Sequence, residues 1–208
     1  MKLFTLIIFI YITSSPFIYA QAINLPENSS LVKAGDKFVT LLGTQINEGD
    51  IAPNFKVVNE SFSPVMLNDF NNKNILISVV PSLDTGVCSI QTKKFNEAVD
   101  KLPENTVLLT ISNDLPFAQK RFCTTANINK TQVLSDSVWR DFGTKYGLLI
   151  KDMGLLTRAI FLINTEQKVV YKELVANLSE HPNYTKALEQ VALLNAEIDT
   201  NLSTNTVN

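Results

Sequence analysis

The chain has 208 residues, of which 45% are hydrophobic and 18% are charged, and its formal net charge is −2. This composition is that of one folded domain with a hydrophobic core, and it excludes a disordered chain. The Lys and Arg residues are scattered along the sequence, so we expect neither a nucleic-acid-binding surface nor a basic membrane patch.

Residues 1–22 have the pattern of a secretory signal peptide. Lys2 precedes an apolar run over residues 3–12, and the small residues Ala20 and Ala22 follow. We expect cleavage after Ala20 or Ala22, export to a bacterial periplasm, and no stable membrane insertion afterwards. An uncleaved anchor is the alternative, although the apolar run is much shorter than the ~20 residues that a spanning helix needs.

The rest of the chain predicts strands and helices in alternation, within one domain over residues 31–194. Residues 21–29 are expected to be loose, and the polar tail over 195–208 to be disordered. In chain order the predicted elements are strands at 31–33, 37–42 and 55–58, a helical turn within 64–70, a strand at 74–80, a helix at 88–101, a strand at 106–112, a helix at 116–124, a strand at 132–134, a helix at 137–146, strands at 158–163 and 168–174, and a helix at 184–196.

Parallel strands joined by helices and followed by an antiparallel pair predict the fold class. It is an α/β, thioredoxin-like fold with a central mixed β-sheet flanked by helices and an N-terminal β-hairpin. The hairpin turns at Gly35 and Asp36. On the helix over 88–101 the pattern places Phe95 inward and Gln91 on another face, and Trp139 is expected to face inward in the helix over 137–146.

The stretch that leads from the strand at 74–80 to the next helix is typical of a reactive thiol. It ends in Cys88, in the first turn of that helix, where free N–H groups and the positive dipole end stabilise a thiolate. Thr85 can direct a hydroxyl to the same point. Pro81 restricts the backbone conformation where the loop begins, and Gly86 leaves the backbone free where the loop ends. We therefore interpret residues 81–88 as the active site.

The chain has two cysteines, Cys88 and Cys123. In an exported protein such a pair is commonly a structural disulfide, and this alternative stays open on spacing alone. The position of Arg158 favours a reactive site instead of a structural disulfide. Arg158 lies in an apolar strand, where an unpaired guanidinium is costly, so an anion site explains it better than packing does. An ion pair with Asp84 or Glu173 is the other explanation.

Three motifs resemble those of the thiol peroxidase branch of the peroxiredoxins, the atypical two-cysteine enzymes of bacteria. Residues 81–88, PSLDTGVC, contain the pattern Pro-x-x-x-Thr-x-x-Cys. Residues 112–123, SNDLPFAQKRFC, resemble the segment that carries the resolving cysteine. Residues 158–163, RAIFLI, resemble the strand that carries the family's arginine. The resemblance covers residues 31–194.

The resemblance implies a peroxidase that reduces hydrogen peroxide and organic hydroperoxides. Cys88 would attack the peroxide as a thiolate and become a sulfenic acid, and Cys123 would resolve it as an intramolecular disulfide. Arg158 would supply the cation, Thr85 would bond the incoming peroxide or the thiolate, and Pro81 would shield the pocket. A thioredoxin-like dithiol protein would supply the electrons, with no cofactor and no metal, and the chain would form a homodimer.

The remaining residues exclude other chemistries. His181 is the only histidine, so a histidine-dependent protease or hydrolase and a zinc site are disfavoured. A non-enzymatic exported domain and a thiol redox sensor remain the alternatives. Because bridged cysteines need Cα atoms about 4.4–6.8 Å apart, we expect local unwinding around Cys88 and around Phe122–Cys123 on oxidation.

Overall fold

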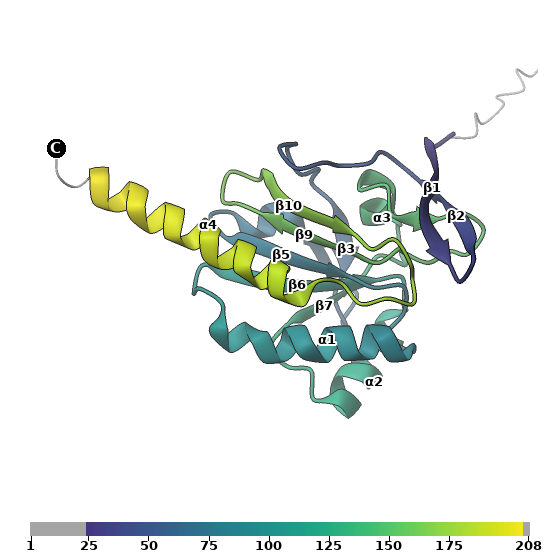
Figure 1. Cartoon of the computed structure of the whole chain (residues 1–208). Coiled ribbons are helices and arrows are strands. Elements are labelled where there is room, and N and C mark those ends of the chain that lie inside the picture. The colour runs from purple at the N-terminus through teal and green to yellow at the C-terminus, as the bar shows by residue number, and fades with distance from the viewer. Residues whose placement is uncertain (1–23, 206–208) are drawn as a thin grey trace, which may run out of the picture.

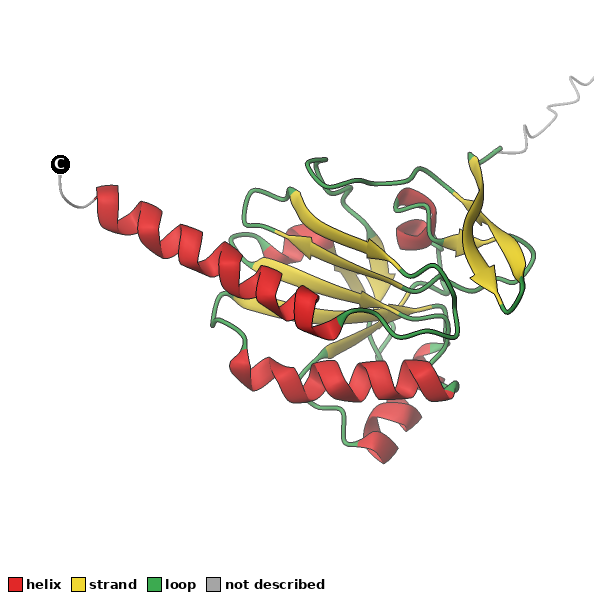
Figure 2. Ribbon diagram, in the orientation of Figure 1, coloured by secondary structure: helices red, strands yellow, loops and turns green. Residues whose placement is uncertain are grey.

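The computed structural model describes residues 24–205, and the predicted signal peptide lies outside them. Two sheets and four α-helices make up this part of the chain (Figures 1 and 2). The strands are β1 (Glu27–Ala34), β2 (Lys37–Leu42), β3 (Lys56–Val58), β4 (Pro64–Met66), β5 (Asn74–Val79), β6 (Thr106–Ser112), β7 (Gln132–Ser135), β8 (Leu149–Ile150), β9 (Ala159–Ile163) and β10 (Val169–Leu174). The helices are α1 (Gly86–Ala98), α2 (Pro116–Ala126), α3 (Asp141–Lys145) and α4 (Tyr184–Asn205), with 3-10 turns at Leu67–Phe70 and Val99–Lys101.

The central sheet has seven strands in the order β10-β9-β5-β6-β7-β3-β4. Neighbours β5, β6 and β7 are parallel, whereas β9, β10, β3 and β4 pair antiparallel. The hairpin of β1 and β2 forms a second sheet with β8. The predicted thioredoxin-like, mixed-sheet architecture with an N-terminal hairpin is thus confirmed.

Alternate residues of β5 face opposite sides of the sheet, which explains why this strand is apolar throughout. Ile75 and Ile77 point into a core with Phe55 and Phe142, on the side of α3. Leu76 points into a core with Phe95 of α1 and with Ala187 and Val191 of α4. Figure 1 shows α1 and α4 running along one side of the sheet. This layering places the start of α1 at the carboxyl end of β5.

Several predicted details differ from the structure. The second half of the 137–146 segment alone is helical, and Trp139 is exposed because it lies in the turn before α3, with Lys56 Nζ 4.0 Å above its ring. Strand β1 begins at Glu27, within the stretch expected to be loose, because it pairs with β2. Strand β8 was not predicted, since two residues carry no periodicity.

The C-terminal prediction also needs correction. Helix α4 continues to Asn205, whereas a disordered tail was expected from residue 195. Asn, Thr and Ser lower helix propensity by only a fraction of 1 kcal/mol each, roughly 0.7 kcal/mol at most, so composition alone does not end a helix. Between residues 24 and 205 no helix is long and apolar enough to cross a membrane.

Candidate active site

Cys88 occupies the first turn of α1. Thr85 is the N-cap residue, with extended backbone angles, and the helix begins at Gly86, so the first N–H groups have no acceptor within the helix. The thiol is fully buried and packs with Val80 and Leu83. Strand, loop and helix therefore place the sulfur as the sequence predicted.

Arg158 lies immediately before β9 and reaches the same thiol. Its Nη2 donates a hydrogen bond of 3.4 Å to the Sγ of Cys88, although 70 residues separate the two in sequence. The residue is 1% exposed. The expected contact between a cation and Cys88 is thus present, and no carboxylate forms an ion pair with Arg158 within the described residues, so the alternative pairing with Asp84 or Glu173 is not observed.

Two neutral acceptors hold Arg158 in place. Its Nη1 donates 2.6 Å to the Oε1 of Gln91, and its Nη2 donates 2.8 Å to the carbonyl oxygen of Leu178. Gln91 is itself fixed, because its Nε2 donates 2.8 Å to the Oγ of Ser78. Neutral acceptors orient the guanidinium without cancelling its charge, so its positive field remains directed at the sulfur.

Gln91 is fully buried, contrary to the predicted outer position. Its polarity favours an outer face, but its spacing of three residues from Cys88 puts the two side chains on the same side of α1. That spacing was the signal that could have identified it. Nothing in the sequence marked Leu178, since a backbone carbonyl has no residue signature.

A cavity of about 440 Å³ opens beside this pair. It is bounded by the active-site loop, by the tip of the β1–β2 hairpin and by the segment after β10. The lining residues are Ala34, Gly35, Pro81, Thr85, Gly86, Val87, Arg158, Leu178 and Ser179. Pro81 and Thr85 therefore border the same space as Arg158.

Thr85 does not contact Cys88 through its hydroxyl. Its Oγ1 donates 3.0 Å to the carbonyl oxygen of Ser82, a bond within its own loop. The residue is exposed to the cavity. With its proton engaged, the hydroxyl oxygen presents lone pairs to an incoming O–H group.

Cys123 lies in α2 and is half-buried, and both cysteines are free thiols. Burial, and to a lesser degree the Glu60 carboxylate, raises the pKa of the Cys123 thiol to about 11. In this conformation Cys123 is therefore a protonated, slow nucleophile. Its neighbour Phe122 packs against the buried cluster of Val80, Leu83 and Cys88.

The carboxylate of Asp114 connects the active-site loop to the start of α2. It accepts hydrogen bonds from the Oγ of Ser82 at 2.7 Å, the N–H of Leu83 at 2.8 Å and the Oγ of Ser112 at 2.8 Å. The N-cap position of α2 is Leu115, so Asp114 does not cap this helix. The carboxylate instead serves the loop that precedes Cys88.

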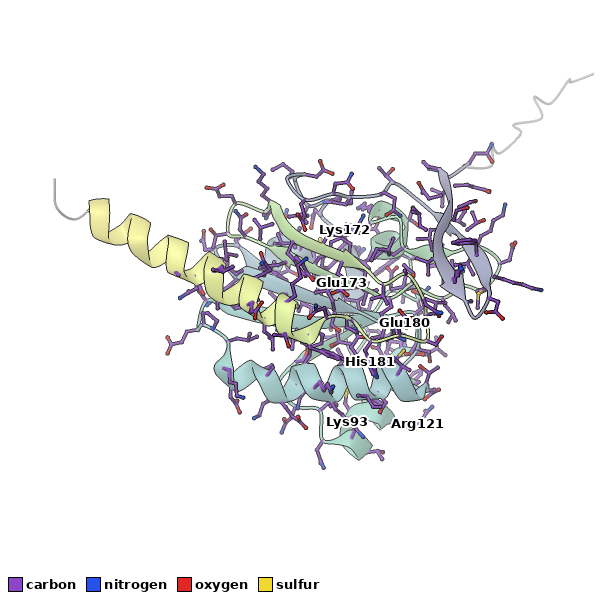
Figure 3. The ribbon with its side chains drawn as sticks, viewed as in Figure 1. Lys93, Arg121, Lys172, Glu173, Glu180 and His181 are labelled. Atoms are coloured by element: carbon purple, nitrogen blue, oxygen red, sulfur yellow. The ribbon has the colours of Figure 1, made fainter. Side chains whose placement is uncertain are left out.

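His181 lies in the loop before α4 (Figure 3) and is exposed. Its Nδ1 is 2.6 Å from the hydroxyl of Tyr184. Partial burial, together with the charges of Lys94 and Arg158, lowers its pKa. No hydrogen bond joins this ring to Cys88. Among the described residues no group of His, Cys, Asp and Glu could hold a metal ion.

A buried thiol at a helix start, beside a buried guanidinium on a thioredoxin-like scaffold, defines a thiol-based oxidoreductase. The Redoxin family model matches residues 47–188. The chain is 50% identical to a thiol peroxidase of Listeria innocua and 48% identical to one of Staphylococcus epidermidis, each over 73% of this chain and 91% of the relative. The chain therefore belongs to the Redoxin family, and it is an oxidoreductase of the peroxiredoxin type.

Solved structures agree with this assignment. A peroxiredoxin-like protein from Aquifex aeolicus superposes with a TM-score of 0.75 at 40% identity, covering 79% of this chain and 97% of that one. A thiol peroxidase from Chromobacterium violaceum has a TM-score of 0.72 at 24% identity, covering 80% and 97%. The second shows the fold alone, and the family predicted from the three motifs is confirmed.

Proposed function

We propose that the chain reduces hydroperoxides through Cys88 and Cys123. The observation that supports this proposal most directly is the hydrogen bond of 3.4 Å from Arg158 Nη2 to Cys88 Sγ, beside a cavity large enough for an organic hydroperoxide. The guanidinium stays charged at every working pH and stabilises both the attacking thiolate and the developing negative charge on the leaving oxygen.

The first step is attack of the Cys88 thiolate on one peroxide oxygen. An S–O bond forms, the O–O bond breaks, and the leaving alkoxide takes a proton to become an alcohol. Arg158 Nε has no hydrogen-bond partner among the described residues, which leaves it for a substrate oxygen. Thr85 accepts from the peroxide O–H, and buried Pro81 excludes water from the sulfur.

The second step forms the disulfide. The Cys123 sulfur attacks the sulfenic acid of Cys88, an S–S bond forms, and water leaves. Phe122 must move from the Cys88 cluster for the sulfurs to meet, so oxidation unwinds the start of α1 and the Phe122–Cys123 turn. Hydrogen exchange in both segments should be faster in the oxidised protein. Identical exchange in the two redox states would count against this step.

A dithiol protein of the thioredoxin type regenerates the two thiols, and no cofactor takes part. The chain works as a homodimer after export to a periplasm and removal of its signal peptide. The free state of both cysteines supports a redox-active pair over a permanent staple.

The test is consumption of cumene hydroperoxide with a thioredoxin system by wild type, Cys88→Ser and Cys123→Ser. We expect turnover by wild type alone, and a single oxidation of Cys88 in Cys123→Ser. Equal inactivity of wild type and Cys88→Ser overturns the peroxidase assignment. Oxidation of Cys88 without turnover, passed instead to another protein, identifies a redox sensor.

A further inference from the structure

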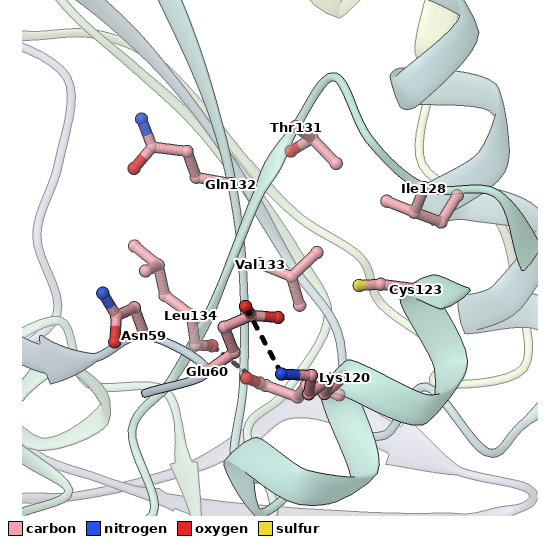
Figure 4. A pocket seen from close by; sticks show the side chains of 10 residues that line it. Asn59, Glu60, Lys120, Cys123, Ile128, Thr131, Gln132, Val133 and Leu134 are labelled. Atoms are coloured by element: carbon pink, nitrogen blue, oxygen red, sulfur yellow. Dashed lines mark hydrogen bonds and ion pairs between the residues drawn. The ribbon is translucent and has the colours of Figure 1, made fainter. Parts of the chain in front are cut away.

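A second cavity, of about 300 Å³, lies against Cys123 and away from Arg158 (Figure 4). Its walls come from α2, from β7 and the segment leading into it, and from the turn between β3 and β4. The lining residues are Asn59, Glu60, Gln119, Lys120, Cys123, Ile128, Thr131, Gln132, Val133 and Leu134. Figure 4 shows Cys123 and Lys120 on the helix, facing Val133 and Glu60. No step described so far uses this space.

Gln119 borders the cavity and carries a buried hydrogen-bond acceptor that has no partner among the described residues. Its side chain is 1% exposed, and its Nε2 donates 3.0 Å to the Oγ of Ser112 and 2.8 Å to the carbonyl oxygen of Leu134. These two bonds fix the amide, while its Oε1 has no partner among the described residues. A buried acceptor without a donor costs about 1–3 kcal/mol, so a ligand N–H group that reaches this oxygen is favoured.

Opposite charges stand at the mouth of the cavity. Lys120 Nζ and Glu60 Oε1 are 3.7 Å apart, and both side chains are more than half exposed. Such a pair contributes little and opens readily, which frees an ammonium for a carboxylate and a carboxylate for an ammonium. Ile128 and Val133 add apolar contact next to the thiol. The site is thus complementary to a small zwitterion with a short apolar stem.

We propose that this cavity binds a small amino-acid thiol, either free cysteine or a short cysteine peptide, that reduces the enzyme at Cys123 as a second reductant beside the dithiol protein. This proposal rests on the proposed function, because the Cys88–Cys123 disulfide is its oxidant. Gln119 and Lys120 precede the Phe122–Cys123 turn that unwinds on oxidation, so they remain in place to hold the incoming thiol.

The exchange runs in two balanced steps. The thiolate of the small molecule attacks the Cys123 sulfur, an S–S bond forms between them, and Cys88 leaves as a thiolate beside Arg158. A second small thiolate then attacks the mixed disulfide, releases a small-molecule disulfide and leaves Cys123 to take up a proton. Two thiols are oxidised for each enzyme disulfide reduced. The Arg158 hydrogen bond to the Cys88 sulfur favours Cys88 as the leaving group.

The test uses full-length mature protein oxidised with one equivalent of hydrogen peroxide. Rates of reduction by L-cysteine, cysteamine and 3-mercaptopropionate are measured, each divided by the same thiol's rate against 4,4′-dithiodipyridine. Cysteamine lacks the carboxylate and mercaptopropionate lacks the ammonium. We expect saturation with L-cysteine and a normalised rate above both analogues, and acid-quenched peptides should carry the cysteine adduct on Cys123.

Matched variants locate the site. Lys120→Met should lower the L-cysteine rate about two- to fivefold, the range for an exposed ion pair, while Arg121→Met on the same helix leaves it unchanged. Gln132→Trp fills the cavity and should abolish saturation. All three variants should be reduced by dithiothreitol at the wild-type rate.

Equal normalised rates for the three thiols, equal effects of the two Met variants, or an adduct on Cys88 would each overturn the proposal. Failure of peroxide turnover even with dithiothreitol instead overturns the proposed function itself.

Discussion

The side-chain amide of Gln91 bridges the two halves of the active site, accepting 2.6 Å from Arg158 Nη1 and donating 2.8 Å to Ser78 Oγ. The guanidinium that touches Cys88 is therefore held from the same helix that carries the thiol. Because the amide is neutral, it orients the arginine and leaves its charge intact. The positive electrostatic field at the Cys88 sulfur therefore depends on Gln91, although Gln91 acts only through Arg158.

Replacing Gln91 should slow peroxide reduction. We expect Gln91→Leu to lower kcat/KM for cumene hydroperoxide roughly tenfold, less than the 10²–10³ typical of deleting a donor itself, because Arg158 keeps its bond to Leu178. The matched control is Lys93→Leu, an exposed position on the same helix that should leave the rate unchanged (Figure 3). A Gln91→Leu enzyme with wild-type kcat/KM and unchanged Tm would show that Leu178 alone positions the guanidinium.

Removing the carboxylate of Asp114 should loosen the active-site loop. Asp114→Ala leaves the Ser82 hydroxyl and the Leu83 N–H without their acceptor, and hydrogen bonds to a charged group contribute about 1.5–3 kcal/mol each. We expect the free energy of unfolding to fall by about 2 kcal/mol and amide exchange at residues 82–84 to accelerate. Urea denaturation and hydrogen exchange measure both. Asp84→Ala, an exposed carboxylate in the same loop, is the control, and equal losses in the two variants would refute a specific role for Asp114.

The charge of Glu60 should slow alkylation of Cys123. The pKa of the Cys123 thiol is raised to about 11, mainly by burial and secondly by the Glu60 carboxylate. In a Cys88→Ser background we expect Glu60→Gln to increase the rate of Cys123 labelling by iodoacetamide about twofold at pH 8, because the thiolate becomes less unfavourable. Labelling stays slow in both proteins, since burial remains. Glu104→Gln, also exposed, should match the parent rate.

The buried carboxyl of Asp136 should make stability depend on pH. Burial raises its pKa from 3.8 to about 7, against the opposing effect of hydrogen bonds from the N–H groups of Phe142 and Gly143. The folded state therefore holds a proton that the unfolded chain has lost, so this contribution to stability is complete below about pH 4 and is lost as pH rises to about 7. Each pKa unit corresponds to about 1.4 kcal/mol, which sets an upper limit of about 4 kcal/mol.

Asp136→Asn is the comparison that isolates this effect. The amide cannot ionise. Wild type should therefore lose stability relative to the variant as pH rises from 4 to 7, and the difference in unfolding free energy should be constant above pH 7. Urea denaturation at intervals across pH 4–8 gives this difference. A difference that does not change with pH would mean that Asp136 ionises in the folded protein as it does in the unfolded one.

Much of the site could be predicted from the sequence because its parts are local. An apolar run, a Pro–Thr–Cys loop and a helix pattern define the surroundings of Cys88, and Arg158 is conspicuous as a charge in an apolar strand. The order of elements and the mixed sheet follow from periodicity in the same way. Trp139 shows the limit of that reasoning. It lies in a turn and stays exposed, and Lys56 of β3 contacts its ring, a contact that sequence periodicity does not reveal.

By itself, then, the sequence determined the fold class, the family and the identity of the thiol, because each rests on residue types at fixed spacing. Only the tertiary structure decided how the thiol is held. Gln91 is polar, so pattern alone places it outside, yet it is buried by partners from other elements, and half-buried Asp114 holds the active-site loop across 31 residues of sequence. The carbonyl of Leu178 and the cavity beside Cys123 likewise exist only where distant segments meet, because hydrogen-bond satisfaction in a packed interior is a property of neighbours in space.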